Sequence, residues 1–265
     1  MKIVVCVKQV PEITDVKVNP ENGTLMREGV ASILNPFCEY ALDHAVRIKA
    51  ARPDTTVAAL TMGPPQARAA LMRCLELGAD EAVLLSDRKF AGADTWATAL
   101  TLASAIRQAS PEYDLILLGK QAIDGDTAQV GPEVAEILGI PQITCAVEVE
   151  IAAKGRRVRA RRECEGGYEV VDARMPALIT TAKGEMLRRV PSFAQVLAAR
   201  RKPMKIMTAD DLQLDESELG LQGSFTQVVK IFPPMARKSG RRVENVEAEQ
   251  AARVMTAFLR AERFI

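Results

Sequence analysis

Residues 115–132, with the sequence LILLGKQAIDGDTAQVGP, contain the pattern that decides the fold. The large apolar residues at 115–118 are typical of a strand that is buried on both faces of a parallel sheet. A loop that contains glycine and aspartate follows, and residues 129–138 have the spacing of a helix. A strand, a loop and a helix in this order predict an α/β protein.

The same alternation extends over the first half of the chain. Apolar runs typical of buried parallel strands occupy residues 3–7, 57–60, 82–85 and 115–118. Amphipathic patterns between them predict helices over residues 40–50, 67–77 and 95–108. Gly78 is expected to end the second helix and Asp94 to cap the third. This order predicts a doubly wound α/β fold with a mostly parallel sheet and right-handed crossovers.

The pattern changes after residue 144. Residues 145–152 and 156–163, joined by Lys154-Gly155, are expected to form a hairpin. Residues 168–173 are expected to add a third antiparallel strand, and residues 177–181 to return to the parallel sheet. The sequence therefore predicts an antiparallel insert before the last parallel strand.

The domain organisation follows from these patterns. We expect residues 1–205 to form one α/β domain, with the hairpin insert at about residues 144–173. The last part of this domain, about residues 183–205, is rich in Arg, Lys, Met and Pro. Residues 206–265 have little apolar content of their own, so we expect an extended C-terminal arm that needs another surface to lie on.

The composition limits the classes of function. Hydrophobic residues make up 48% and charged residues 26%, and 35 basic against 34 acidic residues leave a net charge of +1. This balance argues against nucleic acid as a partner, because neutralising phosphates needs a basic excess. No apolar run approaches the ~20 residues of a membrane span, and the first residues are typical of a strand rather than a signal peptide. A cytoplasmic protein is expected.

Neither a metal site nor side-chain catalysis is predicted. The 5 cysteines are scattered without a C-x-x-C pair, which argues against a disulfide framework and against a zinc or iron–sulfur site. His44 is the one histidine, at an interior helical position next to Asp43. A serine hydrolase would need it, and no G-x-S-x-G motif accompanies it. We therefore expect His44 to be a half-buried helical residue rather than a catalytic base.

The loop after residue 118 is the main candidate for a ligand site. Ligands of open α/β sheets bind where strands end, and the free N–H groups of a helix N-terminus attract phosphate. Gly125 and Gly131 would let the backbone approach a ligand, and Thr127 offers a hydroxyl. Asp126 could cap the helix, or the acids could bind a ribose hydroxyl; the alternative is an ordinary loop with an Asx turn. The candidate residues are Gln121, Asp124, Gly125, Asp126, Thr127, Ala128, Gln129, Val130 and Gly131.

Two further loops are predicted at the same edge of the sheet. Asn35, Pro36, Phe37 and Cys38 stand immediately before a helix, where Pro36 presets the backbone. Met62 lies in a loop that follows a strand. Three converging loops favour a shared nucleotide pocket, while each alone is compatible with an ordinary helix start. The chain has neither a G-x-x-x-x-G-K-[ST] nor a G-x-G-x-x-G motif.

A short helix expected over residues 192–201 is a candidate surface for a partner. Phe193, Val196 and Leu197 make an apolar stripe that ends in the cations Arg200, Arg201 and Lys202. This pattern suits docking to an acidic partner, and it is equally compatible with a surface helix on the protein's own sheet.

Several of these motifs together resemble one family, the beta subunit of electron transfer flavoproteins. The matching segments are VCVKQVP at residues 5–11, NPFCE at 35–39, MGP at 62–64, LGAD at 77–80, and residues 118–131. They occur in this order, and the resemblance covers essentially the whole chain, more weakly after about residue 205.

The resemblance implies a heterodimer with an alpha subunit, onto which the arm of residues 206–265 would dock. It implies a domain of the adenine-nucleotide-binding type over residues 1–205, and a pocket formed by Cys6, Asn35, Pro36, Phe37, Cys38, Met62 and the loop residues from Gln121 to Gly131. The ordinary type of beta subunit holds AMP there and has a third acid where this chain has Gly125. The Asp-Gly-Asp-Thr-Ala-Gln-Val-Gly-Pro version looks like the bifurcating and nitrogen-fixation-related branch, which holds a second FAD.

The function implied is electron transfer through FAD, with the chemistry carried by the flavin. In the bifurcating type NADH is the donor, and a ferredoxin or flavodoxin is a candidate low-potential acceptor. Residues 183–205 would dock an acyl-CoA dehydrogenase-like partner. The alternatives are a conventional carrier with AMP in the beta pocket and, in another class, a stand-alone adenine-nucleotide-binding domain. The long arm after residue 205 would be superfluous in the latter.

Overall fold

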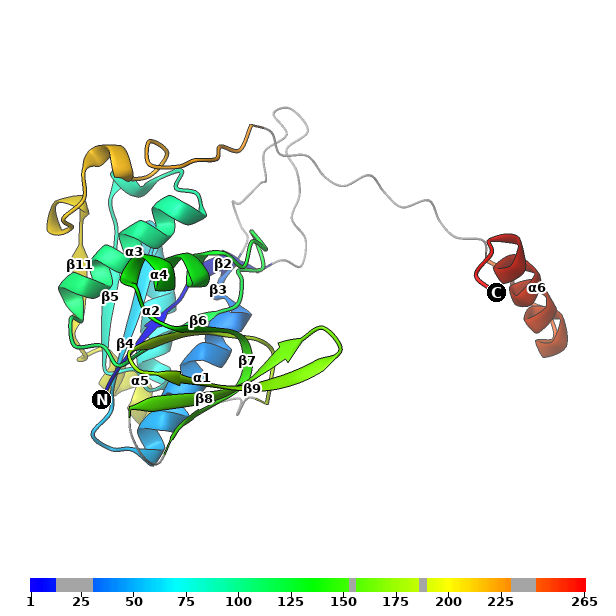
Figure 1. The fold of residues 1–265 in the computed structure, drawn as a ribbon, viewed down its shortest axis with the longest axis horizontal. Coiled ribbons are helices and arrows are strands. Elements are labelled where there is room, and N and C mark those ends of the chain that lie inside the picture. The colour runs from blue at the N-terminus through cyan, green and yellow to red at the C-terminus, as the bar shows by residue number, and fades with distance from the viewer. Residues whose placement is uncertain (13–30, 153–155, 186–189, 230–241) are drawn as a thin grey trace.

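The computed structural model describes residues 1–12, 31–152, 156–185, 190–229 and 242–265 (Figure 1). The predicted turn at Lys154-Gly155 lies outside the described residues. No helix within the described residues is long and apolar enough to cross a membrane.

A nine-stranded sheet forms the body, in the order β11-β5-β4-β1-β6-β10-β7-β8-β9. The strands from β11 to β7 in this order are parallel, and β7, β8 and β9 pair antiparallel. Their bounds are β1 (Lys2–Cys6), β4 (Thr56–Met62), β5 (Glu81–Leu85), β6 (Leu115–Gly119), β7 (Gln142–Ile151), β8 (Arg157–Cys164), β9 (Gly167–Arg174), β10 (Ala177–Thr181) and β11 (Met204–Met207). The predicted fold class and the antiparallel insert are confirmed. A separate small sheet, formed by β2 (Gln9–Pro11) and β3 (Ser32–Leu34), was not predicted.

Helices cover both faces of the sheet. Ile3 and Val5 of β1 belong to the core shared with α1 and α2, whereas Val4 and Cys6 belong to the core shared with α3 and α4. This alternation follows from the two-residue period of a strand that is buried on both faces. Figure 1 shows α3 and α4 side by side on one face. The bounds are α1 (Pro36–Ala51), α2 (Arg68–Leu77), α3 (Thr95–Ala109) and α4 (Val130–Leu138).

The helix ends agree with the expected stop and cap residues. Gly78 ends α2 with a φ of 130°, a conformation that favours glycine. The Asp94 carboxylate caps α3 by accepting a hydrogen bond from the N–H of Ala97 at 3.0 Å. α1 begins at Pro36, earlier than predicted, because proline is well placed in the first turn of a helix.

The C-terminal segment attaches to the body further along the chain than residue 205. β11 adds to the sheet beside β5, and the side chains of Leu212 and Leu219 are buried in the core. Residues 220–226 then lie against the start of α3: Asp94 accepts hydrogen bonds from the N–H and hydroxyl of Thr226 at 2.9 and 3.0 Å. The expected boundary at residue 205 therefore falls inside β11, and the part of the chain that leaves the body begins after Thr226.

The remainder of the arm contains α6 (Ala248–Ala261), which has no buried residue. Met255 is 59% exposed and Phe258 is 46% exposed. Residues 230–241 lie outside the described residues.

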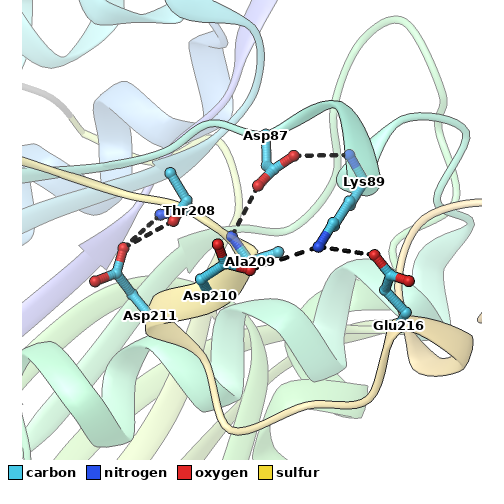
Figure 2. A network of polar contacts seen from close by, with 7 residues as sticks. All are labelled: Asp87, Lys89, Thr208, Ala209, Asp210, Asp211 and Glu216. Carbon is cyan, nitrogen blue, oxygen red and sulfur yellow. Dashed lines mark hydrogen bonds and ion pairs between the residues drawn. The ribbon is translucent and has the colours of Figure 1, made fainter.

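A polar network fixes the segment after β11 to the loop after β5 (Figure 2). The Asp87 carboxylate accepts hydrogen bonds from the N–H of Lys89 at 3.0 Å and from the N–H of Ala209 at 3.1 Å. Lys89 Nζ reaches Glu216 at 2.7 Å and Asp210 at 3.5 Å. Within the segment, Asp211 accepts from the N–H and hydroxyl of Thr208. Short 3-10 helices at Arg88–Phe90, Ala209–Asp211 and Glu216–Glu218 bring these groups together.

Asp87→Asn is expected to lower the free energy of unfolding by about 1 kcal/mol at pH 7, because asparagine keeps one acceptor oxygen where the carboxylate has two. The N–H groups of Lys89 and then Ala209 lower the pKa of Asp87. A lowered pKa means that this stabilisation is fully present above the unfolded pKa of about 4 and is lost as the pH falls through the lower pKa of the folded state. Chemical denaturation at pH 7 and pH 3 measures the effect. If the free energies of unfolding of the parent and the variant differed equally at both pH values, the role given to the Asp87 carboxylate would be contradicted.

Candidate nucleotide-binding site

The candidate site lies where the order of the parallel strands reverses. β1 has β4 on one side and β6 on the other. The chain therefore adds β4 and β5 on one side of β1 and then crosses to add β6 on the other side. In open α/β sheets the crevice outside the carboxyl ends of such strands is the usual ligand site. Here the carboxyl ends of β1 and β6 meet the N-termini of α1 and α4.

Asn35 joins the three segments at this edge. Its backbone N–H donates to the carbonyl of Lys8 at 2.9 Å, and its Nδ2 donates to the carbonyl of Gln121 at 2.9 Å. Its Oδ1 accepts from the N–H of Ile123 at 3.2 Å. The residue is 1% exposed. Asn35, predicted as a cofactor-binding residue, thus uses its amide to shape the loop after β6.

Two glycines allow close contacts at the ends of this loop. A Cβ on Gly119 would lie 2.7 Å from the carbonyl carbon of Phe37, in the first turn of α1. A Cβ on Gly131 would lie 2.3 Å from Cγ2 of Thr180 on β10. Gly125, at the tip of the loop, has nothing within 4 Å of such a Cβ. The loop is therefore held tightly at both ends and is open at its tip.

Each of the two acids of the loop accepts hydrogen bonds from a side chain of the same chain. Lys8 Nζ donates to the two carboxylate oxygens of Asp124 at 2.7 and 3.0 Å. Gln121 Nε2 donates to the Asp126 carboxylate. Because Asp124 is paired with a cation, its charge is less in conflict with an anionic ligand than the sequence suggested, whereas the partner of Asp126 is a neutral amide. Asp126 does not cap α4: the N-cap residue is Gln129, without a side-chain cap, so that expectation was wrong.

The backbone of residues 126–129 has an unusual conformation. Asp126 and Ala128 have φ values of 57° and 56°, in the left-handed region that non-glycine residues rarely adopt. Gln129 follows with φ −100° and ψ −36°. A left-handed residue followed by a right-handed one turns successive N–H groups into a concave anion-binding nest. The N–H groups of Thr127, Ala128 and Gln129 donate no hydrogen bond to any residue that the structure describes, and all three residues are exposed.

The strained loop conformation supports a ligand role. A left-handed non-glycine residue costs on the order of 1–3 kcal/mol, and such residues gather at binding sites. Free N–H groups at the start of α4 also carry the positive end of the helix dipole. The arrangement can bind a phosphate through backbone groups and the Thr127 hydroxyl.

Other predicted site residues lie mainly in the core. Cys6 and Cys38 are buried, and burial raises the pKa of the Cys6 thiol to about 12. Both thiols are therefore neutral at pH 7. Met62 and Val130 pack partly against the core of α3 and α4. Pro36 and Phe37 are half-buried at the start of α1, as is Gln121 in the loop after β6.

The structure also places residues that the sequence patterns did not single out. Lys8 anchors Asp124, and Lys120 Nζ lies 5.4 Å from the centre of the Phe37 ring. The hydroxyl of Thr181 has two carbonyl acceptors for its single hydrogen, that of Leu118 at 3.1 Å and that of Phe37 at 3.2 Å. The position of Lys8 at the end of the first strand was a usable signal, whereas nothing local marks Thr181.

Neither a cluster of metal ligands nor an exposed histidine is found among the described residues. No group of three or more His, Cys, Asp or Glu residues that could hold a metal ion is found among them. His44 is buried in α1, and burial lowers its pKa to about 4. A buried neutral histidine of this kind is a core residue.

The predicted partner-docking segment is a short helix, α5 (Phe193–Ala199). It starts with a capping box: Ser192 accepts from the N–H of Gln195, and the Gln195 side chain accepts from the N–H of Ser192. Phe193 is 79% exposed, and Leu197, Arg200 and Arg201 are also exposed, whereas Val196 is half-buried. α5 packs against α2.

The family described as "Electron transfer flavoprotein domain" matches residues 22–212. The electron transfer flavoprotein subunit beta of Clostridium acetobutylicum is 45% identical over 265 residues, which is 100% of both chains. CarD, a subunit of the caffeyl-CoA reductase-Etf complex of Acetobacterium woodii, is 43% identical over 100% of both chains. Protein FixA of Azotobacter vinelandii is 40% identical over 95% of this chain and 90% of its own. This chain therefore belongs to the electron transfer flavoprotein beta subunit family.

Proposed function

We propose that this chain binds FAD at the carboxyl edge of its sheet and, with an alpha subunit, passes electrons from NADH or a dehydrogenase to downstream acceptors by flavin-based bifurcation. The observation that carries the proposal is the open loop after β6. Its tip at Gly125 faces free space, and the N–H groups of residues 127–129 have no described partner.

The residues of this loop fit the diphosphate of a dinucleotide. The backbone N–H groups of Thr127, Ala128 and Gln129 would bind phosphate oxygens, and the Thr127 hydroxyl would donate a further hydrogen bond. The Lys8–Asp124 ion pair would hold the loop in place and leave its N–H groups directed to the ligand. FAD, when bound, would supply the redox chemistry by accepting a hydride from NADH and releasing electrons one at a time.

The alternative occupant is AMP, as in a conventional, non-bifurcating electron carrier. The same N–H groups would bind its single phosphate. Two features favour FAD. Gly125 leaves space where the ordinary type has a third acid, and the Asp-Gly-Asp-Thr-Ala-Gln-Val-Gly-Pro sequence resembles the bifurcating and nitrogen-fixation-related branch.

The partners proposed follow from two exposed apolar surfaces. α6 exposes Met255 and Phe258, and it would dock onto the alpha subunit. α5 exposes Phe193 and Leu197, and it would dock an acyl-CoA dehydrogenase-like oxidoreductase. The name of CarD, a subunit of a caffeyl-CoA reductase-Etf complex, supports a partner that acts on a CoA ester. We propose a ferredoxin or flavodoxin as the low-potential acceptor. We propose the cytoplasm as the location of the protein.

Gly125→Leu tests the occupant of the loop. A leucine side chain there would enter the space proposed for the diphosphate, so we expect the FAD content of the beta site to fall and its affinity to drop by about tenfold, or about 1.4 kcal/mol. The stability of the chain should not change, because the Cβ of the new side chain has no protein atom within 4 Å and the loop tip is exposed. Flavin extracted from the purified heterodimer measures the effect.

Gly167→Leu is the matched control. Gly167 on β9 also has nothing within 4 Å of an added Cβ, and it is remote in sequence from the loop. This variant should keep the parental flavin content. Unchanged flavin content in Gly125→Leu as well would count against FAD at this loop.

A further inference from the structure

Lys202 has a different role from the two arginines that precede it. Arg200 and Arg201 are exposed, whereas Lys202 is half-buried and turned toward α2. Its Nζ donates hydrogen bonds to the carbonyl of Leu75 at 2.8 Å and to the carbonyl of Ala79 at 2.6 Å. The three cations that form one run in the sequence are thus divided between solvent and the protein.

Of the two carbonyls that Lys202 contacts, that of Leu75 belongs to the last turn of α2, and that of Ala79 follows the C-cap residue Gly78. The last carbonyls of a helix have no partner within the helix, and they carry the negative end of its dipole. A lysine ammonium is well suited to this position. Burial lowers the pKa of Lys202, and the charged hydrogen bonds to the two carbonyls replace the water that it loses.

Contacts with the body are found before α5 and at its C-terminal end. Before the helix, Arg47 Nη2 of α1 donates to the carbonyl of Glu185 at 2.9 Å. At its end, Lys202 binds the end of α2, and Ala199 of α5 is buried. Between these two anchors Val190 is 88% exposed and Phe193 is 79% exposed. Large apolar side chains in contact with water, next to a helix that is anchored to the body at its C-terminal end, are typical of a preformed interaction surface.

We propose that Lys202 is a positioning residue for partner docking. It tethers α5 to α2, so that Phe193 and Leu197 are presented to the dehydrogenase in one fixed arrangement. The proposal rests on the proposed function of α5 as the docking helix. Because a preformed surface loses less entropy on binding, the tether strengthens the complex without touching the partner. It acts through geometry, so its effect should not depend on salt.

The first test needs no partner. In the full heterodimer, Lys202→Ala should speed hydrogen–deuterium exchange of the amides in residues 193–201 by about tenfold. Lys202→Arg should restore most of the protection, because a guanidinium can donate to the same carbonyls. Lys205→Ala removes the same charge from an exposed position on β11 and should leave exchange unchanged. Parental exchange rates in Lys202→Ala would overturn the tether.

The second test measures electron transfer from a purified short-chain acyl-CoA dehydrogenase. Lys202→Ala should raise the KM for the heterodimer by about tenfold at both 0.05 M and 0.5 M salt, with kcat unchanged. Replacing Arg200 and Arg201 by glutamine should raise KM chiefly at low salt, because steering by exposed charges is screened within about 10 Å at 0.1 M. An unchanged KM in Lys202→Ala, with a parental protein that saturates, would overturn the positioning role.

The two tests separate this inference from the proposed function. If the parental heterodimer accepts no electrons from the dehydrogenase, the docking role of α5 fails, and with it the positioning role of Lys202. The exchange measurement would then still decide whether Lys202 tethers α5 to α2.

Discussion

Gly119→Ala is expected to lower the free energy of unfolding by about 3 kcal/mol and to abolish nucleotide binding. The new methyl group would lie 2.7 Å from the Phe37 carbonyl carbon and 2.8 Å from the N of Cys38. Both atoms are backbone atoms in the first turn of α1, so no side chain can move aside. The helix would have to shift away from β6, and the contacts of Asn35 with the loop after β6 would be lost with it. Denaturant unfolding and cofactor extraction measure the two effects.

Gly125→Ala is the control for this prediction. It adds the same methyl group to the same loop, at a position with nothing within 4 Å, and should leave the free energy of unfolding unchanged. If Gly119→Ala were as stable as Gly125→Ala, this result would contradict the close contact between the first turn of α1 and the end of β6.

Removal of residues 227–265 is expected to weaken association with the alpha subunit by about 1,000-fold, or about 4 kcal/mol, while the body stays folded. The deletion starts after Thr226 because Asp94 and the start of α3 hold the chain up to that residue. An arm that wraps a partner would contribute to an interface on the scale of an obligate complex, more than ~2,000 Å². Co-purification of the truncated chain with the alpha subunit measures the loss of association. Thermal unfolding of the truncated chain shows whether the body stays folded.

A pair of substitutions in α6 refines this test. Phe258→Asp places a charge on the exposed apolar face, whereas Arg260→Asp places one about 200° around the helix. The first should weaken the heterodimer and the second should not. A truncated chain that still forms a stoichiometric heterodimer would contradict the proposed role of the arm.

The sequence predicted the core of the fold because its signals there are local. The strands β1, β4, β5 and β6 are short apolar runs, and the helices between them have clear stripes and end signals such as Gly78 and Asp94. β11 was missed because Met204–Met207 is an edge strand with a largely exposed side-chain pattern. The attachment of residues 208–226 depends on contacts such as Thr226 with Asp94, which are distant in sequence and have no periodic pattern.

The candidate site could be predicted in position but not in detail. The loops were placed correctly because the carboxyl ends of parallel strands share one edge of the sheet. The roles of single residues depend on partners far along the chain: Asn35 binds Gln121, Lys8 binds Asp124, and Lys202 binds Leu75. A run such as Arg200-Arg201-Lys202 looks uniform in the sequence, and only the packing of α5 on α2 separates its members.

The cofactor content of the purified heterodimer tests the central claim most directly. The protein would be prepared with its alpha subunit, denatured, and its released nucleotides separated and counted. FAD in the loop after β6 predicts two FAD and no AMP per heterodimer. One FAD and one AMP per heterodimer would contradict it.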